Sequence, residues 1–422
     1  MPNVPHSTPL QDMATITQLP AELLHKVFAE FFNVRRYTFD LNEPLFKVDD
    51  DDLATLAAAS QTCRPFHDVA SPLVWKHFCL DRHRRKPYPT IPQLVALVRL
   101  WHERPEIAAH VHTFHLSPIC HSAPITKEDD IAFIASVVQE LGLPAPQLHE
   151  AVNGFHFIAA LLVLMARNVR VLSMCTFDNG LFRYMPDPGE TSVRLEHLTR
   201  FQFQSGPFVE GRTNHTISEM KPLLRLAPNL EALEVSSVHL GHGDVDWDGI
   251  TSLHLRGASI DDAVKIIRSC RGLKGFIFSP YEVFAPPDEI LSALSMHAST
   301  LRKLNMALQV NSVATFTSLE ELSVSASYMG RGEDCILQEL PQSLKLLEIH
   351  GNPENYPKEM ESLLLKIAGR GYPNLVKVWL SAWYCDCDRR GSCGRQSPCD
   401  GGRGRRDLHE LFLLTGVSCE FR

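Results

Sequence analysis

The segment APNLEALEV, residues 227–235, decides the fold of this protein, because its pattern of apolar residues returns along most of the chain. Leu230, Leu233 and Val235 occupy the apolar places of an apolar-x-x-apolar-x-apolar motif. The end of the motif alternates with period two, which is typical of a short strand that buries one face. The segment therefore predicts a half-buried strand.

We expect strands in ten segments that fit this motif. They are VHTFHL (111–116), VRVLSM (169–174), LTRFQF (198–203), LEALEV (230–235), ITSLHL (250–255), LKGFIF (273–278), LRKLNM (301–306), LEELSV (319–324), LKLLEI (344–349) and LVKVWL (375–380). From the second segment onward, successive starts lie 18 to 32 residues apart. This spacing centres on the roughly 20–29 residues of a leucine-rich repeat.

The sequence between these segments often carries apolar residues at helical spacing, as at 217–228, 261–270, 288–299 and 359–370. APNLEAL and YPNLVKV also resemble the entry to a leucine-rich-repeat strand, although the family's interior asparagine is not clearly kept. We therefore expect an α/β fold over residues 166–422. Its form would be an irregular leucine-rich-repeat-like solenoid, with parallel strands on the inner face and helices outside. An irregular α/β domain is the alternative.

A different pattern opens the chain at LPAELLHKVFAEFF, residues 19–32, which predicts a helix with two apolar ridges. Together the ridges spread over roughly 180°, wider than the ~100° stripe that packing on one core needs. One ridge is Leu23, Val27 and Phe31, which we expect to hold the helix on its own module. The other is Leu24, Phe28 and Phe32, which we expect to face a partner protein.

A loop and three further helices are predicted after this helix. Residues 33–52 are polar and acidic and predict a loop, and Asp51 or Asp52 is expected to cap a helix over 53–62. Pro65 and Pro72 suit the first turns of two further short helices. So few short helices bury only a small core, which is marginal for a domain on its own.

Residues 17–80 resemble an F-box. The pattern LP-x-E-L-L, a leucine-rich second helix and S-x-T-C-R-x-F-x-x-V-A-S-P-L-x-W are matched in order. The matching residues are Leu19, Pro20, Glu22, Leu23, Leu24, Phe28, Leu53, Leu56, Ser60, Cys63, Arg64, Phe66, Ala70, Pro72, Leu73 and Trp75. The departure is the connection at 33–52, which is longer than the family's usual loop.

The F-box resemblance implies a partner, the Skp-type adaptor of a cullin-based ubiquitin ligase. By this resemblance the adaptor-facing residues would be Leu19, Pro20, Leu24, Phe28, Leu53, Leu56 and Trp75. The chain would then be the substrate-recognition subunit of an SCF-type ligase, with the repeat domain holding an unidentified target protein. The alternative is a protein-interaction scaffold that works without a cullin, because the 33–52 loop could block assembly.

The remaining parts of the chain complete the expected organisation. Residues 1–16 are expected to be a disordered N-terminus, and residues 81–165 a helical linker or cap. The formal net charge of −8 argues against a general nucleic-acid binder. The longest apolar run, 155–166, is too short for a membrane span, and the first residues lack the layout of a signal peptide. We therefore expect a cytoplasmic or nuclear protein with mostly reduced cysteines.

Chemistry-bearing motifs are scarce. The sequence has no nucleophile elbow, no phosphate-binding GK[ST] loop and no H-E-x-x-H motif, so we expect no catalysis and no organic cofactor. The exception is a Cys-rich loop over 385–399, with Cys385, Cys387, Cys393 and Cys399. Four thiolates can enclose a tetrahedral zinc ion, but the spacing is not that of a common zinc ribbon. A flexible loop of reduced cysteines is the alternative.

Overall fold

The structure, a computed structural model, describes most of the chain. The described residues are 19–30, 35–36, 46–47, 50–80, 89–116, 124–143, 154–176, 180–187, 189, 191–205, 215–236, 238–239, 247–280, 288–307, 312–326, 335–351, 357–381, 412, 415 and 417–421. They form two compact units. Unit 1 comprises Met1–Met174 and Gly189–His197, and unit 2 comprises Cys175–Pro188 and Leu198–Arg422. The N-terminal segment 1–16 and the Cys-rich loop 385–399 lie outside the described residues.

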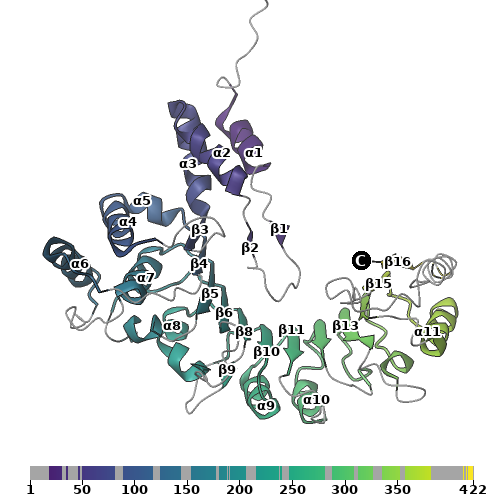
Figure 1. Ribbon diagram of the computed structural model, residues 1–422. Coiled ribbons are helices and arrows are strands. Elements are labelled where there is room, and N and C mark those ends of the chain that lie inside the picture. The colour runs from purple at the N-terminus through teal and green to yellow at the C-terminus, as the bar shows by residue number, and fades with distance from the viewer. Residues whose placement is uncertain are drawn as a thin grey trace, which may run out of the picture. The chain divides into compact units, whose positions relative to one another are not determined.

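Three helices open unit 1 and pack on one another (Figure 1). They are α1 (Ala21–Glu30), α2 (Asp50–Ser60) and α3 (Arg64–Lys76). Helix α2 starts at Asp50, so Asp51 and Asp52 lie in its first turn and the prediction that one of them caps the helix is wrong. Negative charge in a first turn is still favourable, because it faces the positive end of the helix dipole.

Helix α3 corrects a second expectation. The two proline-initiated short helices are one continuous helix, with Pro65 in its first turn and Pro72 inside it. An interior proline removes a backbone hydrogen bond and costs about 3 kcal/mol. The helix continues because Ala70 and Leu73, on either side of Pro72, are both buried, and Leu73 packs in the core that α3 shares with α2.

The expected loop at 33–52 contains a short antiparallel ladder. Strand β1 (Arg35–Arg36) pairs with β2 (Phe46–Lys47), and the Cα partners are Arg35↔Lys47 and Arg36↔Phe46. Antiparallel strands close a chain reversal. The connection between α1 and α2 is therefore a paired insertion at this point, not only a polar loop.

The rest of unit 1 alternates helices with parallel strands. The helices are α4 (Ile91–Glu103), α5 (Pro105–Ala109), α6 (Glu128–Glu140) and α7 (Gly154–Met165). The strands are β3 (His77–Leu80), β4 (Thr113–Leu116) and β5 (Val171–Thr176), with the registers Phe78↔Phe114 and Phe114↔Leu172. Helix α7 is the apolar run of the sequence, and its residues up to Leu164 are all buried, as a central core helix requires.

Unit 2 is a ladder of parallel strands. In chain order they are β6 (Arg200–Ser205), β8 (Ala232–Ser236), β10 (Ser252–Arg256), β11 (Gly275–Ser279), β12 (Lys303–Met306), β13 (Glu321–Ser325), β14 (Leu346–His350), β15 (Lys377–Ser381) and β16 (Ser418–Phe421). Each strand pairs with the next in this order. Two short strands, β7 (His215–Thr216) and β9 (Val238–His239), form a separate parallel pair. In the sequence β7 precedes β8 and β9 follows it.

Helices and 3-10 turns connect these strands. They are η2 (Phe182–Tyr184), η3 (Ile217–Met220), α8 (Lys221–Leu226), α9 (Ile260–Ser269), α10 (Asp288–Ser295), η6 (Ile336–Gln338) and α11 (Pro357–Ala368). Helix α9 starts where Ser259 Oγ accepts a hydrogen bond from the amide of Asp262, over 3.1 Å. Figure 1 shows α9 and α10 along one face of the ladder. The α/β repeat of strand and helix expected from the sequence is confirmed.

The core follows the motif closely. All ten expected segments contain a strand, and the leading apolar residue of each segment is buried, from Val111 to Leu375. Within the strands, residues such as Phe276 and Phe278 are fully buried toward the helices, while the residues between them belong to the other face. Burying one leucine or phenylalanine stabilises the fold by about 1.5–3 kcal/mol, so a regular apolar column is a strong constraint.

Among the described strands of the parallel ladders, β3 and β16 were not predicted from the sequence pattern. Strand β3 lies in HFCL, directly after α3, and its residues were expected to belong to the last F-box helix. The stretch WKHFCL (75–80) does fit the motif, so the signal was present. Strand β16 keeps Cys419 and Phe421 in the two strand positions, but glycine stands two residues before the strand where an apolar residue was required.

Candidate protein-interaction surfaces

In helix α1 the buried and the exposed ridge are the reverse of those expected from the sequence. Leu24 and Phe28 are only 2% and 6% exposed, whereas Leu23 and Val27 are 45% and 39% exposed. The prediction that Leu23 and Val27 hold the module together is therefore wrong. The reason is that α1 turns the ridge of Leu24 and Phe28 toward α2 and α3. Phe31 and Phe32 lie outside the described residues.

The buried ridge supplies the module's own core. Phe28, Leu56, Ala70 and Leu73 form one buried cluster, and Phe66 packs against it. The rings of Phe28 and Phe66 meet edge to face, with 5.2 Å between their centroids. Leu24, Phe28 and Leu56 are among the residues that the F-box resemblance assigned to the adaptor, but their side chains are used inside the module.

Trp75, another adaptor-facing candidate, packs inside unit 1. Its ring stacks on Phe78 at 6.2 Å between centroids and meets Trp101 of α4 edge to face at 6.4 Å. Phe78 in turn contacts Phe114 of β4 at 5.1 Å. This aromatic cluster joins the end of α3 to the first strands of unit 1, so Trp75 fixes the helical module on the rest of the unit.

The remaining candidates are more accessible. Leu19 and Pro20 are exposed at the start of α1, and Leu53 of α2 is half-buried. Leu23 and Val27 lie one turn apart on α1, and Leu19 lies two residues before the helix begins, so the three exposed apolar side chains follow one another along α1 and the residues just ahead of it. We call these three residues the α1 ridge. Glu22 and Lys26 are also exposed and border the ridge on one side. That charged border was the sequence signal that this ridge faces solvent.

A second surface is the face of the unit 2 ladder that points away from the core. Its side chains come from alternate strand positions, and the register places them in a row across the strands. The row runs through Gln202, Glu234, His254, Ile277, Asn305, Ser323, Glu348, Trp379 and Glu420. We call this the open face. It is mostly polar; Gln202, His254 and Ser323 are buried, whereas more exposed positions such as Glu420 can contact a partner while the strand backbones stay paired.

At the β8–β10 end of the open face, three charged or polar side chains hold one another. Arg256 Nε donates to His254 Nε2 over 2.8 Å, so Nε2 is the unprotonated ring nitrogen. His254 Nδ1 lies 3.1 Å from Glu234 Oε1, and Arg256 NH2 lies 3.4 Å from the same oxygen. The histidine is therefore neutral, and the carboxylate and guanidinium balance each other.

The titration of this network follows from its burial. Burial by itself would raise the pKa of Glu234, but the hydrogen bond from His254 and the charges of Arg256 and Arg200 outweigh it and lower the pKa of that carboxyl. Burial lowers the pKa of His254, and its hydrogen bond to Glu234 offsets only part of that effect. Both directions agree with a neutral histidine beside an ionised carboxylate.

At the other end of the open face, β15 and β16 carry a more exposed group. Lys377 Nζ lies 2.6 Å from Glu420 Oε1 and 4.8 Å from the centre of the Trp379 ring. Trp379 Nε1 donates to Glu420 Oε2 over 3.0 Å. On the neighbouring strand, Glu348 is the Cα partner of Trp379. An aromatic ring therefore lies between two carboxylates on an accessible face.

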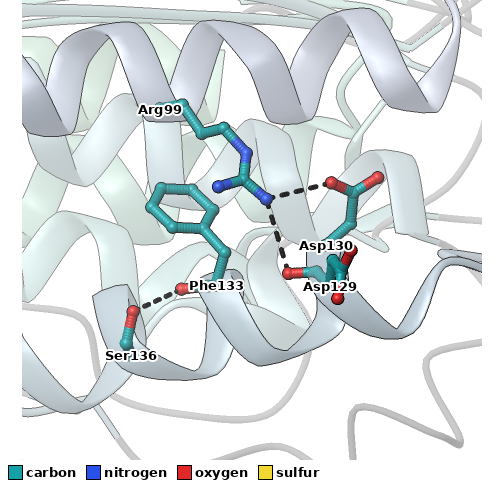
Figure 2. A network of polar contacts seen from close by, with 5 residues as sticks. All are labelled: Arg99, Asp129, Asp130, Phe133 and Ser136. Atoms are coloured by element: carbon teal, nitrogen blue, oxygen red, sulfur yellow. Dashed lines mark hydrogen bonds and ion pairs between the residues drawn. The ribbon is translucent and has the colours of Figure 1, made fainter.

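Unit 1 contains a further charged cluster, which is structural (Figure 2). Arg99 of α4 donates to Asp130 Oδ1 over 3.1 Å and to the carbonyl of Asp129 over 3.4 Å, and its guanidinium lies 4.1 Å from the centre of the Phe133 ring. Both aspartates and the phenylalanine belong to α6. The arginine thus holds α6 against α4, and the nitrogen that makes these hydrogen bonds donates to residues of α6.

Among the described residues, we find no nucleophile with a catalytic arrangement. Ser323 Oγ lies 2.8 Å from His350 Nε2, and Glu348 approaches the same nitrogen at 3.7 Å, so Glu348 does not orient the far side of the ring as the carboxylate of a triad does. Burial raises the pKa of Cys270 to about 12 and that of Cys419 to about 11, which keeps both thiols protonated.

The described part of the chain contains neither a metal-binding cluster nor a membrane-spanning helix. There, no group of three or more His, Cys, Asp or Glu side chains is placed to hold a metal ion. Cys385, Cys387, Cys393 and Cys399 lie outside the described residues, so the zinc hypothesis stays a prediction. No helix within the described ranges has both the length and the apolar character needed to cross a bilayer.

Comparison with protein-family models and with curated proteins finds no match to this chain. The fold and the two surfaces, the α1 ridge and the open face, are therefore the basis for a functional proposal.

Proposed function

We propose that this protein is the substrate-recognition subunit of an SCF-type ubiquitin ligase. Its F-box-like helices would bind a Skp-type adaptor and through it a cullin, and its repeat domain would bind the target protein. The observation that carries the proposal is the α1 ridge, because it exposes Leu19, Leu23 and Val27 on the helix that holds the LP-x-E-L-L pattern. The complex would act in the cytoplasm or the nucleus.

The division of α1 into two faces suits such a partner. Leu24 is buried and Phe28 packs in the core of the helical module, whereas the residues of the α1 ridge are exposed. An apolar groove on a partner protein takes up helix residues at spacings such as i and i+4, which is the spacing of Leu23 and Val27. We therefore assign the adaptor contact to Leu19, Pro20, Leu23 and Val27 instead of the buried set.

In this role the protein performs no covalent step. It would bring the target close to a separately recruited enzyme, and the rate of transfer would rise through proximity and orientation. The aromatic cluster of Trp75, Phe78 and Trp101 supports this role, because it joins the F-box-like helices to the following strands of unit 1. We assign neither a catalytic residue nor a cofactor to the described surfaces.

The test is co-purification of the full chain with a Skp-type adaptor. The double variant Leu23→Asp, Val27→Asp places two charges on the α1 ridge, and we expect at least a hundredfold weaker adaptor binding, about tenfold for each substitution. The matched control is His25→Asp, which adds a charge at an exposed position of α1 outside the ridge. Normal adaptor binding by the double variant would refute the assignment.

A second function is favoured by the β1–β2 ladder. Because this paired insertion lies between the two helices of the adaptor-binding pattern, it could keep a cullin from joining the complex, leaving an interaction scaffold without ligase activity. Replacing residues 33–49 with a short Gly-Ser linker separates the two functions. If cullin is recovered only with the shortened chain, the scaffold is favoured. Recovery of cullin with the natural chain supports the ligase.

A further inference from the structure

The β14–β16 end of the open face has the composition of a cation-binding surface. Glu348, Trp379 and Glu420 are successive Cα partners on the three strands. Neighbouring strands lie about 4.8 Å apart, so the two glutamates flank Trp379 on the strands at either side of it. An aromatic face bordered by negative charge attracts ammonium and guanidinium groups.

The structure already holds a cation at this place. Lys377 lies on the same strand as Trp379, and its ammonium rests 4.8 Å from the centre of the indole ring while pairing with Glu420. The hydrogen bond from Trp379 Nε1 to Glu420 fixes the ring and one carboxylate relative to each other. The site is therefore preorganised, and the chain's own lysine marks where a cation lies.

The other charged groups of the open face are less suited to a partner. Glu234, His254 and Arg256 are largely buried and satisfy one another. Glu420, in contrast, is 49% exposed. Among the described residues, the C-terminal group also has two carboxylates, Glu348 and Glu420, and one ammonium, that of Lys377, with His350 3.7 Å from Glu348. A negative balance at this end agrees with the formal net charge of −8 of the whole chain.

We propose that this surface, defined by Glu348, Trp379 and Glu420, binds a basic peptide segment of the target protein. An arginine or lysine side chain of the target would displace the ammonium of Lys377 from the Trp379 ring and lie between the two carboxylates. Lys377 then competes with the target for this site, and target segments that bind weakly or carry no basic side chain do not displace it. This inference rests on the proposed function, since it names the class of target that the repeat domain recognises.

The test measures binding of a fluorescein-labelled (Gly-Arg)4 peptide to the full-length protein by fluorescence anisotropy. We expect Trp379→Ala and Glu420→Gln each to weaken binding about tenfold, the loss of one good cation–π or ionic contact. Lys377→Met removes the competing ammonium but keeps the apolar stem, and we expect it to strengthen binding several-fold. A (Gly-Glu)4 peptide should not bind.

The matched control is Lys303→Met. Lys303 also lies on the open face and pairs with Glu321 over 2.9 Å, so this variant removes the same charge away from the Trp379 ring. If Lys303→Met strengthens binding as much as Lys377→Met, the effect is general electrostatics and the proposed site is wrong. Absence of arginine-peptide binding, or equal binding of the (Gly-Glu)4 peptide, also overturns it.

Failure of this site can be told apart from failure of the ligase proposal. The Leu23→Asp, Val27→Asp variant changes the α1 ridge in unit 1, and we expect it to bind the arginine peptide as the natural chain does. Peptide binding without adaptor binding would leave the basic-segment site standing and reject the ligase. Adaptor binding without peptide binding would do the reverse.

Discussion

Leu23 and Leu24 are adjacent in the sequence but lie on opposite faces of α1, where Leu23 is 45% exposed and Leu24 is 2% exposed. Successive residues of a helix are 100° apart, so neighbours can belong to different surfaces. In this helix one leucine is buried in the helical module and the other lies on its surface. The same substitution at the two positions therefore has different consequences.

Leu24→Asp should unfold the helical module, whereas Leu23→Asp should not. A carboxylate at the buried position has no described partner in the apolar cluster, and we expect a loss of about 4 kcal/mol or more. At the exposed position the change should stay within about 0.5 kcal/mol. Circular dichroism during thermal unfolding measures both. Equal destabilisation by the two substitutions would contradict the assignment of Leu24 to the buried face of α1 and of Leu23 to its exposed face.

Glu234→Ala should destabilise unit 2 far more than Glu321→Ala. The first substitution leaves the mostly buried Arg256 without its carboxylate, and we expect a cost of about 3 kcal/mol. The second removes one member of the exposed Lys303–Glu321 pair, which is worth less than about 1 kcal/mol. Urea unfolding of both variants gives the comparison. Similar losses would show that the β8–β10 network is not specially stabilising.

Arg99→Ala should loosen the attachment of α6 to α4 in unit 1. The variant loses the contact of the guanidinium with Phe133 and the ion pair with Asp130, and we expect a cost of about 1 kcal/mol because the arginine is partly exposed. Arg104→Ala is the control, since its pair with Glu106 is exposed. Hydrogen exchange of the α6 amides should rise in the first variant alone.

The stability of unit 1 should fall as the pH decreases below neutrality. Burial, followed by the charges of Lys76 and His112, lowers the pKa of His77 from 6.5 to about 4. Between these values the unfolded chain binds a proton that the folded chain does not. Stability is therefore complete above pH 6.5 and is lost by at most about 1.4 kcal/mol per pH unit down to about pH 4.

The variant His77→Gln tests this assignment. We expect a smaller difference in the free energy of unfolding between pH 7 and pH 5 for the variant than for the natural chain, by about 1–2 kcal/mol. Burial also lowers the pKa of His112, so some pH dependence should remain. An unchanged pH slope would show that His77 is accessible to protons in the folded protein.

The cysteine cluster gives a separate prediction about metal content. If Cys385, Cys387, Cys393 and Cys399 bind zinc, the purified protein should contain about one equivalent, and Cys393→Ser should release it. Elemental analysis of both proteins is the measurement. Protein that is purified without chelators and contains no zinc would leave the alternative, a loop of reduced cysteines.

Much of the fold could be predicted from the sequence because its period is short and regular. Each strand segment places three apolar residues at fixed spacing, and all ten segments contain a strand. Strand β16 escaped prediction where glycine replaced an apolar residue of the motif. Helix α3 was divided wrongly at Pro72, because local propensity argues for a break and only packing with α2 overrides it.

The sequence by itself determined that strands alternate with helices and that α1 has two apolar ridges, since both follow from the spacing of residues along one element. Only the tertiary structure decided which ridge is buried, because that depends on where α2 and α3 pack. It also decided that Trp75 packs against Phe78 and Trp101 of unit 1. The register of β14, β15 and β16 likewise brings Glu348, Trp379 and Glu420 together from positions far apart in the chain. Contacts of that kind depend on the pairing of distant segments, and the spacing of residues within one segment does not encode them.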